Sequence, residues 1–440
     1  MALEKPHAVL ARRAVAAATI GNALEFYDFV TYTFFSIQIG HAFFPGKSAY
    51  VSLMLSLATF GAGFITRPIG GIIIGRYADR VGRRSAMMLS FIMMGVAIVA
   101  LALIPPYAQI GVAAPILAVA ARMVQGFSLG GEVGPTTAYL LEAAPAHRRG
   151  LAVSWQGASQ GLSAAVGGAV GFGLSNLMAP AALDAYGWRI AFLLGAVTLP
   201  FGLWLRRTLP ETLHAPEPAP ASRTTPQPAR ASASSERTGM GLIQDSRRII
   251  VLALVVLAAG TIGTYVFNYM TTFAQHTLHM APGPAFAAGA LGNVVGVAGG
   301  LFGGWLSDKV GRRPVMIIPA ILNLALLIPI FAWITESRTV LALTVGTAVI
   351  SLMGAIGGGA FYTAVAESLP KRIRGATFAT VYAFSIAIFG GTTQLVITWL
   401  IHATHSNMAP AWYLLGASAF GLVARWLIVE SAPAKMAAAG

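Results

Sequence analysis

Two copies of one unusual charged cluster, each lying between long apolar runs, constrain the fold of this chain more than any other feature. Gly-Arg-Tyr-Ala-Asp-Arg-Val-Gly-Arg-Arg occupies residues 75–84, and Gly-Trp-Leu-Ser-Asp-Lys-Val-Gly-Arg-Arg occupies residues 304–313. A second pattern, Glu-x-x-Pro-x-x-x-Arg-Gly, begins at Glu142 and recurs in the same order from Glu367. Such repeats indicate duplicated halves, and between membrane-length apolar segments they are typical of transporters whose halves move against each other.

The composition places the chain in a lipid bilayer. Of its 440 residues, 56% are hydrophobic and only 10% are charged, whereas soluble domains carry roughly 25% charged residues. The net charge of +14 does not indicate nucleic-acid binding, because the basic residues lie between apolar runs and not on one folded face. Cysteine is absent and leaves the redox compartment undecided. We expect an uncleaved N-terminus, because Glu25 and Asp28 interrupt its first apolar run.

Apolar runs long enough to cross a bilayer predict an all-α membrane protein with twelve transmembrane helices in two pseudo-symmetric six-helix bundles. The predicted helices are 14–41, 51–76, 85–105, 111–142, 149–178, 188–206, 248–278, 284–308, 314–335, 339–369, 374–403 and 410–431. The stretch between the bundles is rich in Pro, Ala, Ser and Arg and is predicted to be a flexible linker. The predicted domains are a cytoplasmic N-terminus (1–13), an N-terminal bundle (14–206), a cytoplasmic linker (207–247), a C-terminal bundle (248–431) and a cytoplasmic tail (432–440).

The distribution of Lys and Arg predicts the orientation of the helices. Most of the 29 basic residues fall on one side of the predicted spans, whereas Lys47, Arg189 and Arg338 fall on the other. Because cytoplasmic loops carry an excess of Lys and Arg, we expect both termini to be cytoplasmic. The basic charge then reflects topology, and the expected location is a bacterial inner membrane.

The repeated Gly-x-x-x-Asp-Arg-x-Gly-Arg-Arg cluster, with twelve helices and a central linker, resembles the major facilitator superfamily. Three further segments are similar to its metabolite:proton symporter family: Gly-Asn-Ala-Leu-Glu-Phe-Tyr-Asp-Phe at 21–29, Thr-Arg-Pro-Ile-Gly at 66–70 and Gln-Gly-Phe-Ser-Leu-Gly-Gly-Glu at 125–132. Within that family, residues 154–160 and 387–391 look most like citrate and tricarballylate carriers. The resemblance implies a proton-coupled carrier of a small metabolite.

Four ionisable residues inside the apolar runs are the leading functional candidates. A charge at the bilayer centre costs at least roughly 2.5 kcal/mol, so each needs a partner or a function. Arg122 presents a planar guanidinium that matches a carboxylate, which makes it the expected anchor for an organic anion. The alternative is a purely structural ion pair between Arg122 and Glu25 or Asp28.

Glu25, Asp28 and Glu132 are the candidates for proton coupling. A carboxylate in a low-dielectric site binds a proton near neutral pH, whereas a nearby guanidinium opposes this. A substrate carboxylate that takes the arginine would therefore release an acid side chain to bind a proton. The alternative is that Glu25 and Asp28 only fix helix packing.

Polar side chains along the helices are expected to line the cavity around Arg122, although each is equally able to bridge two helices. Arg67 is the only other cation nearby and is expected toward the cytoplasmic end. Histidines at the outer helix ends are expected to be solvated and not to bind metal. The predicted lining residues are Gln125, Gln156, Ser159, Gln160, Tyr265, Asn268, Tyr362 and Gln394, and the histidines are His276, His279, His402 and His405.

The repeated loop clusters are expected to act as gates. The resemblance implies that Asp79 and Asp308 make charge contacts across the cytoplasmic face that hold one conformation closed and break in the other. The alternative, basic residues that serve topology alone, leaves the two aspartates at matching positions unexplained. The predicted gating residues are Asp79, Arg80, Arg83, Glu142, Arg149, Asp308, Arg312, Glu367 and Arg374.

These features predict a monomeric symporter that imports a small organic acid with protons by alternating access. The proton gradient drives it, so no cofactor is expected, and its partners are the organic acid, protons and the lipid bilayer but no nucleic acid. A zwitterion such as betaine or proline is the alternative substrate, and a nontransporting receptor is the alternative class. No spacing typical of a nucleophile, metal or cofactor site favours an enzyme, and no charged or carbonyl ring favours a channel.

Overall fold

The computed structural model describes residues 19–203 and 246–432, except 21, 24–25, 47, 131–139, 142–143, 198 and 201. Within these residues the chain is helical and contains no strand. Helices are expected in a bilayer, because every backbone N–H and C=O must find its partner inside the segment. The predicted class, an all-α membrane protein, is confirmed.

In the first half, α5 and α9 match the predicted spans 85–105 and 149–178 within two residues, whereas α4 extends beyond the predicted end at 76 and the end of the span 111–142 lies outside the described residues. A helical stretch at 26–34 leads into α2. The elements are α2 (Ser36–Phe43), α3 (Ala49–Ile65), α4 (Arg67–Val81), α5 (Arg83–Leu103), α6 (Tyr107–Ile110), α7 (Ala113–Leu129), η1 (Ala146–Arg148), α9 (Arg149–Leu177), α10 (Pro180–Ala182), η2 (Leu183–Gly187) and α11 (Trp188–Val197).

In the second half, π-helical turns follow α14 and α18. The elements are α14 (Arg247–Thr272), η3 (Phe273–Thr277), α15 (Pro282–Val310), α16 (Arg312–Ser337), α17 (Val340–Ser368), α18 (Lys371–Ser385), η4 (Ile386–Gly390), α19 (Gly391–Thr404) and α20 (Ala409–Leu427). Seven helices of the described part are long and apolar enough to cross a membrane, and Ala113–Leu129 is a shorter apolar helix. The count of twelve stays a prediction.

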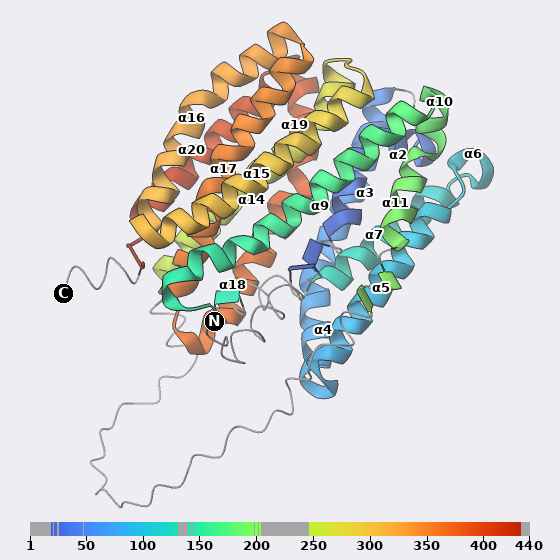
Figure 1. The fold of residues 1–440 in the computed structure, drawn as a ribbon. Coiled ribbons are helices and arrows are strands. Elements are labelled where there is room, and N and C mark those ends of the chain that lie inside the picture. The colour runs from blue at the N-terminus through green and yellow to red at the C-terminus, as the bar shows by residue number, and fades with distance from the viewer. Residues whose placement is uncertain are drawn as a thin grey trace, which may run out of the picture.

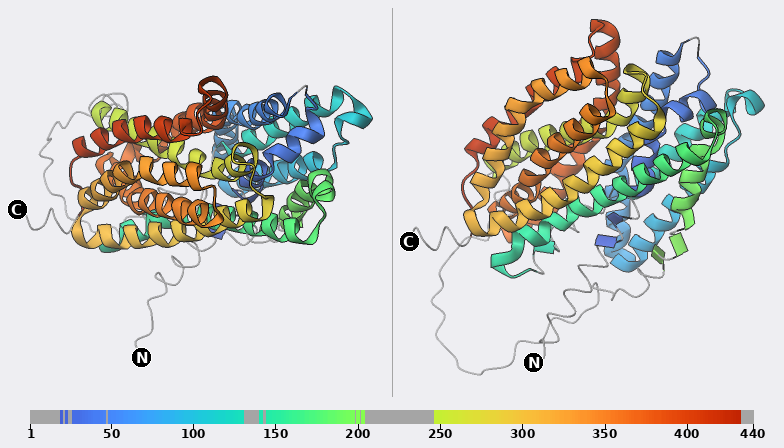
Figure 2. Two further views of the ribbon diagram at one scale, coloured as in Figure 1. Left: turned by 90° about the horizontal axis from the view of Figure 1, so that it is seen from above. Right: turned by 45° about the horizontal axis from the view of Figure 1, so that its top comes forward.

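The two halves lie side by side, and α9 of the first half runs along α15 of the second (Figures 1 and 2). Small residues allow this approach, because a Cβ atom on Gly304 would lie 2.6 Å from the carbonyl oxygen of Gly150. In a bilayer, where lipid tails are as apolar as the side chains, such close backbone packing is a main source of helix association.

The bundle has two chemically different ends. One end, here called the basic end, carries Arg76, Arg80, Arg148 and Lys309, where α4 ends, α9 begins and α15 ends. The opposite end carries the turns from α2 to α3, from α9 to η2 and from η3 to α15. In Figure 1, α4 and α18 lie toward the basic end, whereas α2, α6 and α10 lie toward the opposite end.

A break between α3 and α4 shapes the interior of the first half. Pro68 has no N–H to continue the helical hydrogen-bond ladder, and α3 ends two residues before Arg67. The Thr66 hydroxyl at the break donates to the Met123 carbonyl of α7 at 2.7 Å. A Cβ atom on Gly126 would overlap the Gly63 carbonyl oxygen, so α3 and α7 are in backbone contact there. Arg67, the first residue of α4, directly follows this break.

Candidate substrate site and basic-end cluster

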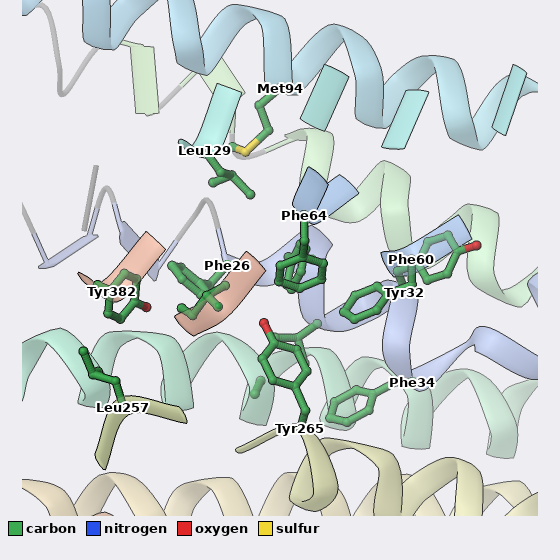
Figure 3. Close-up of a cluster of buried hydrophobic side chains, with 14 of the residues drawn as sticks. Phe26, Tyr32, Phe34, Phe60, Phe64, Met94, Leu129, Leu257, Tyr265 and Tyr382 are labelled. Carbon is green, nitrogen blue, oxygen red and sulfur yellow. The ribbon is translucent and has the colours of Figure 1, made fainter. Parts of the chain in front are cut away.

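Aromatic side chains from both halves form a wall in the interior. The ring centroids of Phe29 and Phe60 are 4.8 Å apart, those of Phe60 and Phe64 are 5.3 Å apart, and Tyr265 of α14 lies 5.6 Å from Phe64. Figure 3 shows Tyr265 pointing across from the second half toward Phe64. Tyr32 stacks on Phe60 at 5.7 Å. This aromatic wall surrounds the two buried arginines.

Arg122 is fully buried against the aromatic wall. Its guanidinium carbon lies 4.5 Å from the ring centroid of Tyr32, 5.0 Å from that of Phe29 and 5.2 Å from that of Phe60. Nη1 donates to the Gln125 side-chain oxygen at 2.5 Å, whereas Nε and Nη2 have no hydrogen-bond partner in the described part of the chain. Nε and Nη2 lie on one edge of the guanidinium, and two free N–H donors on one edge of a buried cation are the geometry that binds a carboxylate.

Arg67 is part of the same site. It is 5% exposed, and its guanidinium carbon lies 4.5 Å from the ring centroids of both Phe29 and Phe64. Both arginines therefore contact one ring, that of Phe29. Arg67, expected as the only other cation nearby, thus lies directly beside the ring that Arg122 contacts.

Asp28 is the buried carboxylate beside these arginines. It is 1% exposed, and neither carboxylate oxygen has a hydrogen-bond partner among the described residues. Arg122 and Arg67 both lie close enough to act on its charge. The other two candidates for proton coupling, Glu25 and Glu132, lie outside the described residues.

Two of the predicted lining residues tie the first helix to α9. The Asn22 amide donates to the Ser159 hydroxyl at 2.6 Å, and the Gln156 amide donates to the Asn22 side-chain oxygen at 3.1 Å. Ser159 also donates to the Gln156 carbonyl at 2.8 Å. Both residues therefore bridge the two helices, and Gln156 in addition keeps a buried side-chain oxygen with no partner in the described part.

Two of the predicted lining residues of the second half, Tyr265 and Tyr362, lie near a third tyrosine, Tyr382. The Tyr362 ring lies 6.4 Å from that of Tyr382, whose hydroxyl is reached by the Gln160 side chain of α9. Asn268 is 7% and Gln394 is 1% exposed, and no described residue bonds to either polar atom of the Gln394 amide. The structure thus adds Tyr382 to the predicted set.

Part of the predicted gate forms one connected cluster at the basic end. Arg312 binds Asp308 at 2.7 Å and Glu367 at 3.2 Å. Asp308 also accepts hydrogen bonds from the backbone N–H groups of Gly150 and Leu151 at 2.8 and 3.0 Å. These two residues lie in the first turn of α9, so a carboxylate of the second half caps the N-terminus of a helix of the first half. Arg149 lies 4.0 Å from Glu367 and adds a second link between the halves.

Glu430 and Ser431, which were not predicted, complete this cluster. Glu430 accepts from the backbone N–H groups of Arg312 and Arg313 at 2.8 and 3.0 Å, and Ser431 donates to Glu367 at 2.8 Å. Burial acts to raise the pKa of Glu430, but hydrogen bonds from four backbone N–H groups outweigh it and hold that pKa below its usual value. The sequence signal was a carboxylate at the end of the last predicted helix, 410–431.

Of the remaining gating candidates, the structure describes the side chain of Arg80. Arg80 is exposed at the end of α4. Glu142 and the side chains of Asp79, Arg83 and Arg374 lie outside the described residues. The first-half counterpart of the cluster therefore stays a prediction.

The helical bundle, with its paired halves, buried arginines and a charged cluster that joins the halves at one end, defines a membrane transporter. The model of the Major Facilitator Superfamily matches residues 18–392. The chain belongs to that superfamily, and its predicted membership is confirmed.

Curated relatives and solved structures agree with this assignment. The chain is 33% identical over 412 residues to the citrate-proton symporter of Klebsiella pneumoniae, in an alignment that covers 93% of this chain and 90% of the relative. It is 30% identical over 438 residues to the proline/betaine transporter of Salmonella typhimurium, which covers 96% of this chain and 84% of the relative. A crystal structure of a D-xylose-proton symporter shares the fold, with a TM-score of 0.72 and 19% identity over 96% of this chain and 98% of that one.

Proposed function

We propose that this transporter imports a small organic acid, a citrate-like di- or tricarboxylate, together with protons. One observation carries the proposal: two buried guanidiniums, those of Arg67 and Arg122, contact one ring and face a single described carboxylate, that of Asp28. The described charges of the site are therefore positive on balance. A buried uncompensated cation is costly, and a multivalent anion relieves this cost.

A zwitterion is the second candidate, because relatives include proline/betaine transporters and aromatic rings bind quaternary ammonium groups. The occupancy of the aromatic wall argues against it. The rings of Phe29 and Phe64 lie against Arg67, and those of Tyr32 and Phe60 lie against Arg122. Since the protein's own cations already contact these rings, the site offers more to a carboxylate than to an ammonium group.

Proton coupling follows from competition for the arginines. In the empty site, Arg67 and Arg122 lie near Asp28, and a nearby guanidinium opposes the protonation of a buried carboxylate. When a substrate carboxylate takes the guanidiniums, Asp28 is left in a low-dielectric site, where it binds one proton and becomes the neutral acid. Substrate and proton then move together, because the proton on Asp28 removes one negative charge from the loaded site.

The basic end is proposed to face the cytoplasm, in line with the excess of Lys and Arg in cytoplasmic loops. The cluster around Arg312 then lies at the inner mouth and links the halves there. In this account, its contacts break and re-form as the transporter alternates between its inward-facing and outward-facing states.

Uptake by proteoliposomes under an inward proton gradient tests the proposal. Labelled citrate should accumulate, a protonophore should abolish the accumulation, and unlabelled tricarballylate or 2-oxoglutarate should compete. Glycine betaine at the same concentration should not. Competition by betaine without competition by any carboxylate would reject the organic acid, and citrate binding without uptake would favour a receptor.

A further inference from the structure

A cavity of about 720 Å³ lies at the opposite end of the bundle, between the two halves. Its walls come from the turn between α2 and α3, from η2 and from the turn between η3 and α15. Just below it the halves touch: the hydroxyls of Ser36 and Thr272 are 3.0 Å apart, and Thr272 donates to the Thr33 carbonyl at 3.3 Å. These contacts join the halves next to Ile37, which lines the cavity, here called the vestibule.

A buried amide points to a ligand in the vestibule. Gln38 lines the vestibule, is 5% exposed, and has a side-chain oxygen without a hydrogen-bond partner in the described part of the chain. A buried acceptor left unpaired is destabilising, so this oxygen requires a donor, either a bound water or the hydroxyl group of a bound solute. Through its NH₂ group the same amide donates to carboxylate oxygens.

Imidazoles from both halves line the same vestibule. His41 belongs to α2, and His276 and His279 belong to η3 and to the turn that follows it. The three are close enough for their charges to interact. Asp184 of η2 also lines the vestibule, and its carboxylate binds His41 Nδ1 at 2.9 Å. Because this contact is made through Nδ1, the Nε2 edge of the His41 ring is left for a ligand.

We propose that the vestibule is a second, weaker binding site for a di- or tricarboxylate, which rests there before the contacts at Ser36 and Thr272 open. The inference deepens the proposed function and depends on it for the substrate class. A molecule with several carboxylates binds the imidazoles of the second half and the Gln38 amide of the first at once. A metal ion is a poorer occupant, because no three His, Cys, Asp or Glu side chains among the described residues are grouped to hold one.

Direct binding tests the site without transport. The Arg122→Ala protein, in which the central site lacks its anchor, is titrated with citrate by calorimetry. It should keep a weak binding event, and adding His276→Ala and His279→Ala should weaken that event at least about ten-fold. Adding His405→Ala, a histidine at the same end but outside the vestibule lining, should leave it unchanged. If the Arg122→Ala protein shows no residual citrate binding, or if its binding is unchanged by His276→Ala and His279→Ala, the vestibule site does not exist.

Transport from each side provides a test in which Arg122 is intact. The double variant His276→Ala/His279→Ala should raise the KM for citrate about ten-fold in right-side-out vesicles, with the maximal rate unchanged. In inside-out vesicles its KM should equal that of wild type. A KM that changes equally from both sides, or from neither, would reject the vestibule site. If wild-type protein binds citrate in the vestibule but does not transport it, the proposed function is wrong and the vestibule site is still supported.

Discussion

Replacing Arg122 by Lys isolates the contribution of the guanidinium fork from that of its charge. In the structure, Nη1 is held by Gln125, while Nε and Nη2 are free among the described residues. The fork therefore gives a substrate carboxylate two parallel N–H bonds. A lysine ammonium at this position offers a point charge that the Gln125 oxygen also attracts, so about one charge-assisted bond is lost. Such a bond contributes roughly 1.5–3 kcal/mol, which corresponds to a loss of roughly 10- to 150-fold in affinity.

The assay is citrate uptake by proteoliposomes at concentrations well below KM, with Arg122→Lys compared with wild type. Arg189→Lys is the matched control, because Arg189 also lies over an aromatic ring, that of Trp188, but donates to the Ala102 carbonyl on α5, away from the aromatic wall. The control should transport normally. Size-exclusion profiles should be the same for all three proteins. If Arg122→Lys also transports normally, the fork does not bind substrate and the proposed role of Arg122 is wrong.

Three further predictions concern proton coupling, packing and the basic end. Asp28→Asn should abolish accumulation driven by a proton gradient but keep exchange of labelled for unlabelled substrate across the membrane; loss of both would make Asp28 structural. Gly126→Ala places a methyl group against the Gly63 carbonyl and should destabilise the protein by about 1–3 kcal/mol, measured as a lower Tm in detergent. The control Gly157→Ala, whose new carbon meets no neighbouring atom within 4 Å, should leave the Tm unchanged. Glu430 has a lowered pKa in the folded protein, so its stabilising effect is present above the unfolded pKa and is lost as pH falls through the folded pKa. The difference in Tm between wild type and Glu430→Gln should therefore shrink on acidification. A difference that grows would contradict this.

The sequence predicted the fold and part of the site because charge inside an apolar run is a local signal. Asp28 and Arg122 were found in this way, and both are buried at the aromatic wall. The predicted helix 339–369 is α17, Val340–Ser368, because its apolar run is bounded by polar residues. In each case the information lies within one helix length of sequence.

The rest of the site depends on contacts between segments far apart in the chain. Arg67 was expected only as a nearby cation toward the cytoplasmic end. Its contact with the Phe29 ring that Arg122 also touches is a tertiary feature, as is the contact between Gly63 and Gly126. Glu430 was assigned to the last helix, but α20 ends at Leu427 and the carboxylate binds the start of α16. No spacing in the sequence predicts either contact.

A cryo-EM map of the protein with bound citrate tests the central claim most directly. Carboxylate oxygens of the ligand should lie about 3 Å from guanidinium nitrogens of both Arg67 and Arg122, beside the ring of Phe29. Citrate density elsewhere in the bundle, with either guanidinium turned toward lipid or held by a protein carboxylate, would contradict the account.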